Sequence, residues 1–376
     1  MTVNLTPMDQ FRRFLDDVVF SPMGLILLFA GLSWALMLAF GNPLIAWFKN
    51  RKGMKWAPRE DTPDSHGAKA GTPSMGGIGI IGAALVGFVG VFVFAFATSA
   101  LTRGNTGAGA DSLYLAVFPL LVGLHALLGY VDDHSKATNR GGISSKAKLL
   151  GQMVLAAAFL AVVFVLKEGT TAGIGRFDSV IFDSPLWLLG AFLLIIGTSN
   201  AVNLTDGIDG LAAGLSVQVA AVFAVLSFES HGAAPFNFLG VSASYFWLCL
   251  GGACLGFLAF NKFPAKVFMG DTGSLALGAA LGAGALVTKS VALLPFIGFI
   301  FFVEMFSVIF QVLYFKWTKR KTGEGKRIFR RAPLHHHYEL GGWSERRVVW
   351  TFWMVNFFTS GVGLILWKMG ILPKFP

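Results

Sequence analysis

The sequence has few charged residues and a large excess of apolar ones. Asp, Glu, Lys and Arg make up 13% of the 376 residues, whereas 55% are hydrophobic and 37 are phenylalanine, giving a mean hydropathy of +0.66. A soluble core does not need that much apolar material, so the composition excludes an ordinary soluble globular protein. We expect a protein that lies in a lipid bilayer.

Cysteines and the common nucleotide-binding loops are also scarce. Cys249 and Cys254 lie in one apolar run at a spacing that fits neither a disulfide framework nor a zinc site, so we interpret both as buried thiols. The pattern Gly77-x-Gly79-x-x-Gly82 opens an apolar run with no strand before it, which favours helix packing over a dinucleotide site. We find no ATP-binding motif, and we expect no nucleic-acid partner.

Apolar runs long enough to cross a bilayer follow one another along the chain. They lie near residues 20–47, 75–100, 112–131, 149–167, 185–202, 210–228, 239–260, 271–288, 291–317 and 348–369. Of the 30 Lys and Arg residues, 22 fall on one side of these runs, and short cytoplasmic loops are the ones that retain positive charge. We predict an all-α polytopic membrane protein, one domain over 1–376, with about ten spans, periplasmic termini and a cytoplasmic active site.

Carboxylates stand where the predicted spans reach the cytoplasmic face. Asp132 and Asp133 are adjacent at the end of the third run, and Asp271 lies between glycines at the start of the eighth. Carboxylate oxygens suit Mg²⁺ or Mn²⁺, so we predict that these three residues hold a metal ion. Solvated loop charge for the adjacent pair and helix capping for Asp271 are the alternatives.

The segment 200–211 is rich in amides and acids, although apolar spans flank it. If a helix continues through it, Asn200, Asn203 and Asp206 fall on one face and Asp209 extends the row. Capping and helix breaking explain Asn203 and Gly207 but not two acids. We therefore predict that this segment contributes to a binding site.

Other inner loops carry groups that suit phosphates and a base. Glycines and hydroxyls beside a lysine can bring backbone N–H groups against phosphate oxygens, as at Lys69, Thr72 and Ser74. Phe268 is either an ordinary interfacial aromatic or a platform for a nucleobase. Lysines near the acids, such as Lys136, would pair with phosphates.

Three consecutive histidines, His335, His336 and His337, lie in the largest inner loop among several arginines. Histidine-rich composition suggests a transition metal, but adjacent side chains do not readily bind one ion. We therefore favour contact with phosphate or substrate. Glu304 lies within the ninth run, where an acid is either a packing residue or part of an ion pathway.

Together these motifs resemble the phospho-N-acetylmuramoyl-pentapeptide transferase family over nearly the whole chain. The Pro-x-His-His-His run distinguishes this resemblance from the wider group of polyprenyl-phosphate hexosamine phosphotransferases. The motifs that carry it are Lys69 with 72–77, Asp132-Asp133, Asn200 to Gly210, Asn261 to Ser274 and Pro333 to Glu339.

The resemblance implies an enzyme of the bacterial inner membrane that requires Mg²⁺. Its substrates would be UDP-N-acetylmuramoyl-pentapeptide and undecaprenyl phosphate, and its products lipid I and UMP, with a homodimer as a possible assembly. The matching residues Asp132, Asp133 and Asp271 would be the acidic essentials, and His335 would also be required. The predicted substrate-binding residues are Lys69, Thr72, Ser74, Lys136, Lys148, Asn203, Asp206, Asp209, Asn261, Phe268, His336 and His337.

Two other functions fit parts of the pattern. One is transfer of N-acetylglucosamine phosphate by the same chemistry, and the other is an ion-coupled transporter, for which Glu304 would be useful. The order of steps is also open. Because a phosphate monoester is largely dianionic at pH 7, we favour direct attack by the lipid phosphate, with Asp132 as a base or orienting group rather than a nucleophile.

Overall fold

The computed structural model describes residues 6–15, 17, 21–50, 69, 71–103, 112–138, 141–168, 184–233 and 238–373. Most of the first loop that the sequence predicts to be cytoplasmic, 51–68, lies outside the described residues. The helices are α1 (Pro7–Phe14), α2 (Pro22–Lys49), α3 (Gly77–Arg103), α4 (Ser112–Ala137), α5 (Ser145–Glu168), α7 (Pro185–Thr205), α8 (Leu211–Ala233), α9 (Phe238–Asn261), α10 (Gly270–Val287), η3 (Val291–Leu293), α11 (Leu294–Ile297), α12 (Phe299–Thr322), α13 (Leu334–Glu339) and α14 (Glu345–Lys368).

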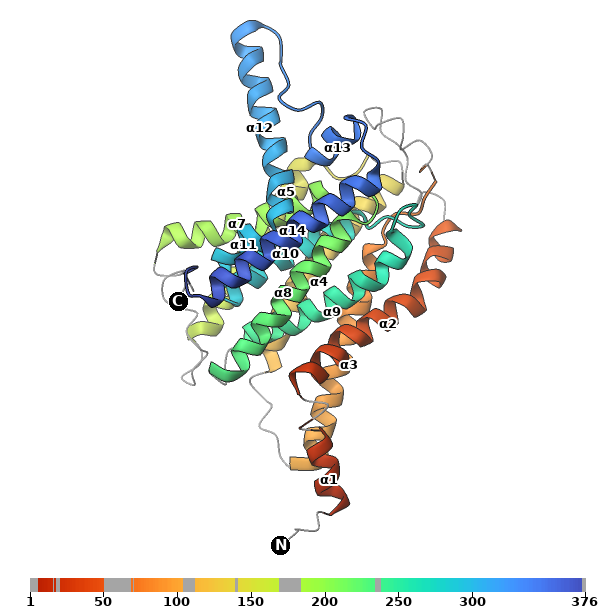
Figure 1. Cartoon of the computed structure of the whole chain (residues 1–376), viewed down its shortest axis with the longest axis vertical. Helices are drawn as coiled ribbons and strands as arrows, with labels where there is room; N and C mark the ends of the chain where they lie inside the picture. The colour runs from red at the N-terminus through yellow and green to blue at the C-terminus, as the bar shows by residue number, and fades with distance from the viewer. Residues whose placement is uncertain are drawn as a thin grey trace.

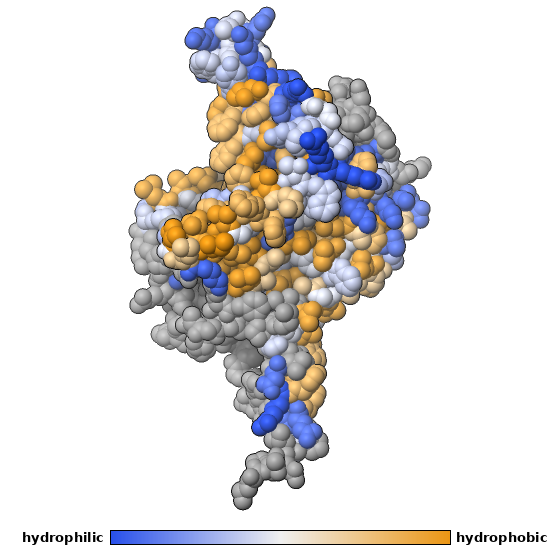
Figure 2. Space-filling view, in the orientation of Figure 1, coloured by the Kyte–Doolittle hydropathy of each residue, from blue (hydrophilic) through white to orange (hydrophobic). Residues whose placement is uncertain are grey.

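Every apolar run of the sequence except 291–317 corresponds to one helix. In the part of the chain that is described, 8 helices are long and apolar enough to cross a membrane, and α8 contributes a shorter apolar stretch, Leu211–Leu226. The protein is therefore an all-α polytopic membrane protein. Apolar side chains cover the middle of the molecule and hydrophilic ones gather toward its two ends (Figure 2).

The ninth predicted span differs from the observed structure. The sequence predicts one helix from 291, but the chain forms the short helices η3 and α11 and then turns at Gly298 before α12 begins. Pro295 fits the first turn of α11, where its missing N–H is harmless, so this stretch starts a new helix instead of continuing one. The far end of α12 projects from the molecule opposite α1 (Figure 1).

Glycines allow α10 to pack closely against its neighbours. A Cβ on Gly77 of α3 would lie 2.1 Å from the Gly273 nitrogen, and one on Gly129 of α4 would lie 2.2 Å from the Asp271 carbonyl oxygen. Gly278 of α10 approaches the backbone of α7 in the same way. Small residues thus bring the helix that carries Asp271 against α3, α4 and α7. The predicted packing role of Gly77 is confirmed.

Candidate functional site

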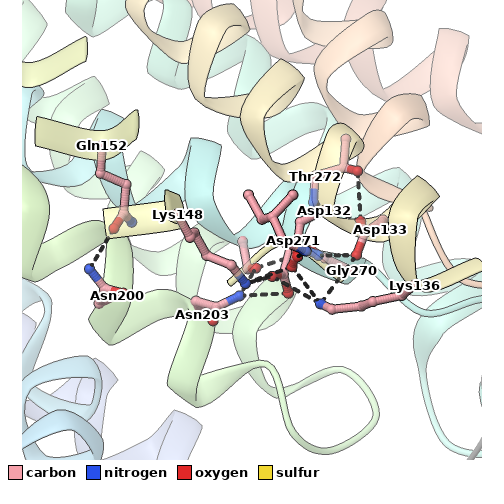
Figure 3. Close-up of polar contacts among 12 residues, drawn as sticks. Asp132, Asp133, Lys136, Lys148, Gln152, Asn200, Asn203, Gly270, Asp271 and Thr272 are labelled. Atoms are coloured by element: carbon pink, nitrogen blue, oxygen red, sulfur yellow. Dashed lines mark hydrogen bonds and ion pairs between the residues drawn. The ribbon is translucent and has the colours of Figure 1, made fainter. Parts of the chain in front are cut away.

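Two carboxylates and two lysines meet where α4, α5 and α10 come together. Lys136 Nζ lies 2.7 Å from Asp132 Oδ2 and 3.1 Å from Asp271 Oδ2. Lys148 Nζ lies 2.6 Å from Asp132 Oδ2 and also contacts Asp271 Oδ2. Asp132 and Lys136 are one helical turn apart on α4, whereas Lys148 comes from the first turn of α5. Figure 3 shows these side chains pointing toward one another.

Asp133 lies beside this centre but binds the start of α10. Its Oδ2 accepts hydrogen bonds from the Thr272 amide (2.9 Å) and hydroxyl (2.7 Å), and its Oδ1 accepts one from the Asp271 amide (3.1 Å). The first turn of a helix has free N–H groups, and Met269 at the N-cap provides no side-chain acceptor. The structure therefore places Asp133 as a cap supplied by α4, and its predicted metal role stays a prediction.

Asp271 does not cap its own helix. Its Oδ1 accepts a hydrogen bond from Asn203 Nδ2 at 2.9 Å, and its Oδ2 faces the two lysines. Asn203 also donates to Ser274 Oγ at 2.8 Å, so α7 is tied to the first turn of α10. The capping interpretation of Asp271 is therefore wrong.

The polar row of segment 200–211 is split by the end of α7. The helix ends at Thr205, so Asp206 is its C-cap residue and Asp209 lies in the following turn. Asn200 bonds to Gln152 of α5 at 3.0 Å, away from the acidic centre. Burial raises the pKa of the Asp206 carboxyl to about 8, and the charges of Asp271 and Asp133 act in the same direction. A cation near this turn would relieve that repulsion.

A second cluster forms around Lys69. Its Nζ lies 2.7 Å from Asp209 Oδ1, 2.6 Å from Glu345 Oε1 and 6.0 Å from the centre of the Phe268 ring. Asp209 Oδ2 accepts a hydrogen bond from the Ala265 amide at 2.9 Å. Lys69, Asp209, Phe268 and the start of α14 therefore lie together, although they are far apart in the sequence.

The first and fourth inner loops are joined through their backbones. The Phe268 amide donates to the Pro73 carbonyl, and the Gly76 amide donates to the Phe268 carbonyl, each at 2.8 Å. Asn261 holds the other side of the fourth loop, because it accepts from the Gly210 amide (3.0 Å) and donates to the Val267 carbonyl (2.9 Å). Phe268 is half-buried in this frame, and Thr72 and Ser74 lie half-buried in the paired segment.

The three histidines point to different partners. His335 is buried against Glu304, His336 Nδ1 lies 2.7 Å from Glu339 Oε2, and His337 Nδ1 accepts from the Arg330 amide at 3.1 Å. The prediction that they do not bind one ion together agrees with this divergence. Among the described residues, no group of three His, Cys, Asp or Glu side chains is arranged to hold a metal ion.

The donor chemistry at Asp132 and Asp271 nevertheless suits a hard cation. Both carboxylates turn an oxygen toward the same lysine nitrogens, so two negative oxygens already share cationic partners. Mg²⁺ takes one or two carboxylates and completes its shell with water and substrate phosphates. The residues present fit such an ion.

Comparison with known proteins agrees with the family resemblance of the sequence motifs. A family model for glycosyl transferase family 4 matches residues 115–289. The phospho-N-acetylmuramoyl-pentapeptide-transferase of Desulforamulus reducens is 42% identical over 343 residues, which cover 89% of this chain and 94% of that protein. Those of Shouchella clausii (42% over 353 residues, 89% and 98%) and Listeria monocytogenes (40% over 334 residues, 88% and 92%) are similar. The chain belongs to the phospho-N-acetylmuramoyl-pentapeptide-transferase family.

Most of the residues that this family member brings together in space are among those predicted from its sequence. The acidic centre unites Asp132, Asp271, Lys136, Lys148 and Asn203, as the clustering of inner loops predicts. The second cluster unites Lys69, Asp209, Asn261 and Phe268 with the fourth loop. His336 and His337 lie on α13 with partners of their own.

Two residues of the site were missed or left undecided. Glu345, which pairs with Lys69, is the first residue of the last long helix, where an acid is expected for ordinary helix-dipole reasons. The sequence is compatible with Glu304 as a packing residue or as part of an ion pathway, and the structure pairs it with His335. The one available signal for Glu304 was that buried acids in apolar helices need a partner.

Proposed function

We propose that this protein transfers phospho-N-acetylmuramoyl-pentapeptide from UDP-N-acetylmuramoyl-pentapeptide to undecaprenyl phosphate, giving lipid I and UMP. The observation that carries the proposal is the centre in which Lys136 and Lys148 lie between Asp132 and Asp271. It lies at the ends of the candidate spans α4 and α5 and at the start of α10, where a soluble diphosphate and a lipid phosphate can both arrive. The names of relatives about 40% identical over about 90% of the chain support the same reaction.

We further propose that the reaction requires Mg²⁺, held by Asp271 and Asp132. When bound, the ion would neutralise charge on the diphosphate of the nucleotide sugar. Asp133 would stabilise the first turn of α10 and so keep Asp271 in place. Asn203 would orient the Asp271 carboxylate through its Oδ1, leaving Oδ2 directed at the lysines.

The lysines supply the remaining positive charge. Each is already placed by two carboxylates, so each ammonium group is oriented before the substrate arrives. One phosphoanhydride is exchanged for another, so positioning and charge neutralisation are sufficient and no further energy source is needed. Asp132 would orient the attacking phosphate or accept its remaining proton.

The second cluster is proposed as the uridine nucleotide pocket. Phe268 would stack on the base, and Lys69, Asp206 and Asp209 would contact the rest of the nucleoside and its phosphates. Thr72, Ser74 and the nearby backbone amides would bind the sugar phosphate, with His336 and His337 toward the peptide-bearing sugar. The loops are held by hydrogen bonds between their backbones, which favours a pocket that is largely formed before binding.

The two alternatives have less support. Relatives named for N-acetylmuramoyl-pentapeptide transfer do not favour an N-acetylglucosamine phosphate donor. Glu304, the residue that a transporter would use, is engaged with His335, and the other acids of the site lie at helix ends.

The location in the bacterial inner membrane, ten spans with periplasmic termini, and a homodimer are part of the proposal. The Gly278 face supports no dimer, because it packs on α7 of the same chain.

Release of UMP is the direct test. Purified protein, undecaprenyl phosphate and Mg²⁺ are incubated with either UDP-N-acetylmuramoyl-pentapeptide or UDP-N-acetylglucosamine, and UMP is measured by chromatography. We expect UMP and a lipid-linked product with the first nucleotide only, and loss of both after removal of divalent cations. Release with UDP-N-acetylglucosamine alone, or uptake into vesicles without UMP, would overturn the proposal.

A further inference from the structure

Glu304 of α12 holds His335 of α13 at two points in the interior. Its Oε1 accepts a hydrogen bond from the His335 backbone amide at 3.0 Å, and its Oε2 lies 3.1 Å from Nδ1 of the ring. The side chains of His335 and Glu304 are 1% and 0% exposed. Two bonds from one carboxylate fix both the backbone and the plane of the imidazole.

The opposite edge of the same ring lies against the turn after α7. His335 Nε2 is buried and has no hydrogen-bond partner in the described part of the chain. A Cβ on Gly207 would lie 2.3 Å from Nε2 and 2.7 Å from Cε1. Any residue other than glycine would therefore clash with the ring at this position. The backbone conformation at position 207 does not itself require glycine, because its φ is not positive.

The turn that rests on His335 carries two proposed nucleotide contacts. Asp206 directly precedes Gly207, and Asp209 follows two residues later. Two hydrogen bonds hold the rest of the turn. The Ala265 amide donates to Asp209 Oδ2, and the Gly210 amide donates to Asn261 Oδ1. Gly207 packs directly on the His335 imidazole. The position of that ring therefore limits how far the Asp206 end of the turn can move inward.

We propose that Glu304 and His335 are positioning residues that support the Asp206–Gly207 turn from beneath and thereby present Asp206 and Asp209 to the nucleotide. This rests on the proposed function, and it gives His335 a different role from the catalytic one that the family resemblance implies. A ring that is 1% exposed offers no surface to a substrate, whereas its contact with Gly207 is direct.

The carboxylate of Glu304 fixes the orientation of the His335 ring. A carboxylate only accepts hydrogen bonds, so the His335 ring presents Nδ1–H to Glu304 and turns its Nε2 edge toward Gly207. A glutamine at 304 would fill nearly the same volume, but its amide cannot accept from both the backbone amide and Nδ1–H. The ring would rotate or change tautomer, and the turn would lose its support.

A first experiment measures UMP affinity by calorimetry and thermal stability on the full-length protein. Gly207→Ala should weaken UMP binding about tenfold in the wild-type background, because the new methyl group and the ring cannot share the space. In a His335→Ala background the same change should cost less than about twofold, since the clash is gone. Gly197→Ala is the matched control, because a Cβ at this α7 glycine meets nothing within 4 Å. An equal loss from Gly207→Ala in both backgrounds would overturn the proposal.

A second experiment separates positioning from chemistry. Glu304→Gln should raise the KM for the nucleotide sugar and weaken UMP binding by about five- to hundredfold, while kcat changes by less than about threefold. A fall in kcat with KM and UMP affinity unchanged would show that His335 acts in the chemical step and would sink the positioning role. Wild-type protein that binds no UMP would instead overturn the proposed function itself.

Discussion

Lys69 Nζ lies 2.6 Å from Glu345 Oε1, which joins the first inner loop to the start of the last membrane helix. The same nitrogen lies 2.7 Å from Asp209 Oδ1. The side chains of Asp209 and Glu345 are 2% and 10% exposed, so one lysine neutralises two largely buried carboxylates. Such an arrangement depends strongly on this lysine, because losing an ion-pair partner is expensive for a buried charge.

Lys69→Met should therefore destabilise the protein strongly, by roughly 3 to 5 kcal/mol. Adding Glu345→Gln should recover part of the loss, because one of the two carboxylates that pair with Lys69 then carries no charge. Melting temperatures in one detergent check both variants, with Lys262→Met at an exposed position as the control. Identical melting temperatures for the single and double variants would contradict the shared-cation interpretation.

Asp133→Asn tests the cap that α4 supplies to α10. Asparagine keeps one acceptor oxygen but turns an NH₂ group toward backbone donors, so we expect a loss of about 1 to 3 kcal/mol of stability. If capping is the whole role of Asp133, the Mg²⁺ concentration that gives half-maximal activity should remain near the wild-type value. A large rise in that concentration with an unchanged melting temperature would make Asp133 a metal ligand instead.

Much of this fold follows from the sequence, because ten apolar runs have few other solutions in a bilayer. The acidic centre also follows in outline, since Asp132, Lys136 and Asp271 all stand at the ends of predicted runs, and the structure brings them together. Helix ends set by local chemistry were harder: the break at Gly298 and the short α13 lie within stretches whose composition does not define them.

The choice of partners could not be predicted. Asp133 binds Thr272, 139 residues away, and Lys69 binds Asp209, 140 residues away. These contacts depend on how the inner loops cross in space, which periodicity does not reveal. Asn200 shows the same limit, because its place in the amide row suggests the site, whereas the rotation of α7 turns it toward Gln152.

Phe268→Ala should weaken uridine nucleotide binding by about 1 to 3 kcal/mol, or roughly five-fold to over a hundred-fold, by removing one stacking platform. Affinity for the lipid phosphate should change little. Calorimetric titration with UMP gives the first value and the KM for undecaprenyl phosphate the second. Phe263→Ala, an exposed phenylalanine in the same loop, is the control, and equal losses for both substrates would indicate a misplaced loop.

Asp271→Asn should abolish turnover chiefly by weakening Mg²⁺ binding, because it removes a negative oxygen ligand while nearly preserving shape. The two lysines beside it would keep one carboxylate partner, Asp132, so the fold should persist. Activity measured across a range of Mg²⁺ concentrations should show partial rescue at most. If the Asp271→Asn variant were as active as the wild type at ordinary Mg²⁺ concentrations, Asp271 would not belong to the site.

Asp132 distinguishes two mechanisms for the transfer. A nucleophilic Asp132 must form a phospho-aspartyl intermediate and release UMP before the lipid arrives, whereas a base or orienting group does neither. The structure favours the second role in two respects. Asp132 Oδ2 lies within ion-pair distance of Lys136 and Lys148, and Oδ1 accepts from the Ile143 amide at 2.9 Å, so the carboxylate is fixed at both oxygens, as an orienting group requires.

Direct attack by the lipid phosphate then predicts three results. Asp132→Asn should lower kcat by at least about a hundredfold, the range expected when a general base is lost, yet leave UMP affinity nearly unchanged. Wild-type protein given nucleotide sugar and Mg²⁺ without lipid should release no stoichiometric burst of UMP in a rapid-quench experiment. Mass spectrometry of that mixture should find Asp132 unmodified, because the acceptor phosphate is already largely dianionic and needs no covalent relay. A burst equal to the enzyme concentration, with phosphosugar attached to Asp132, would establish the two-step route instead.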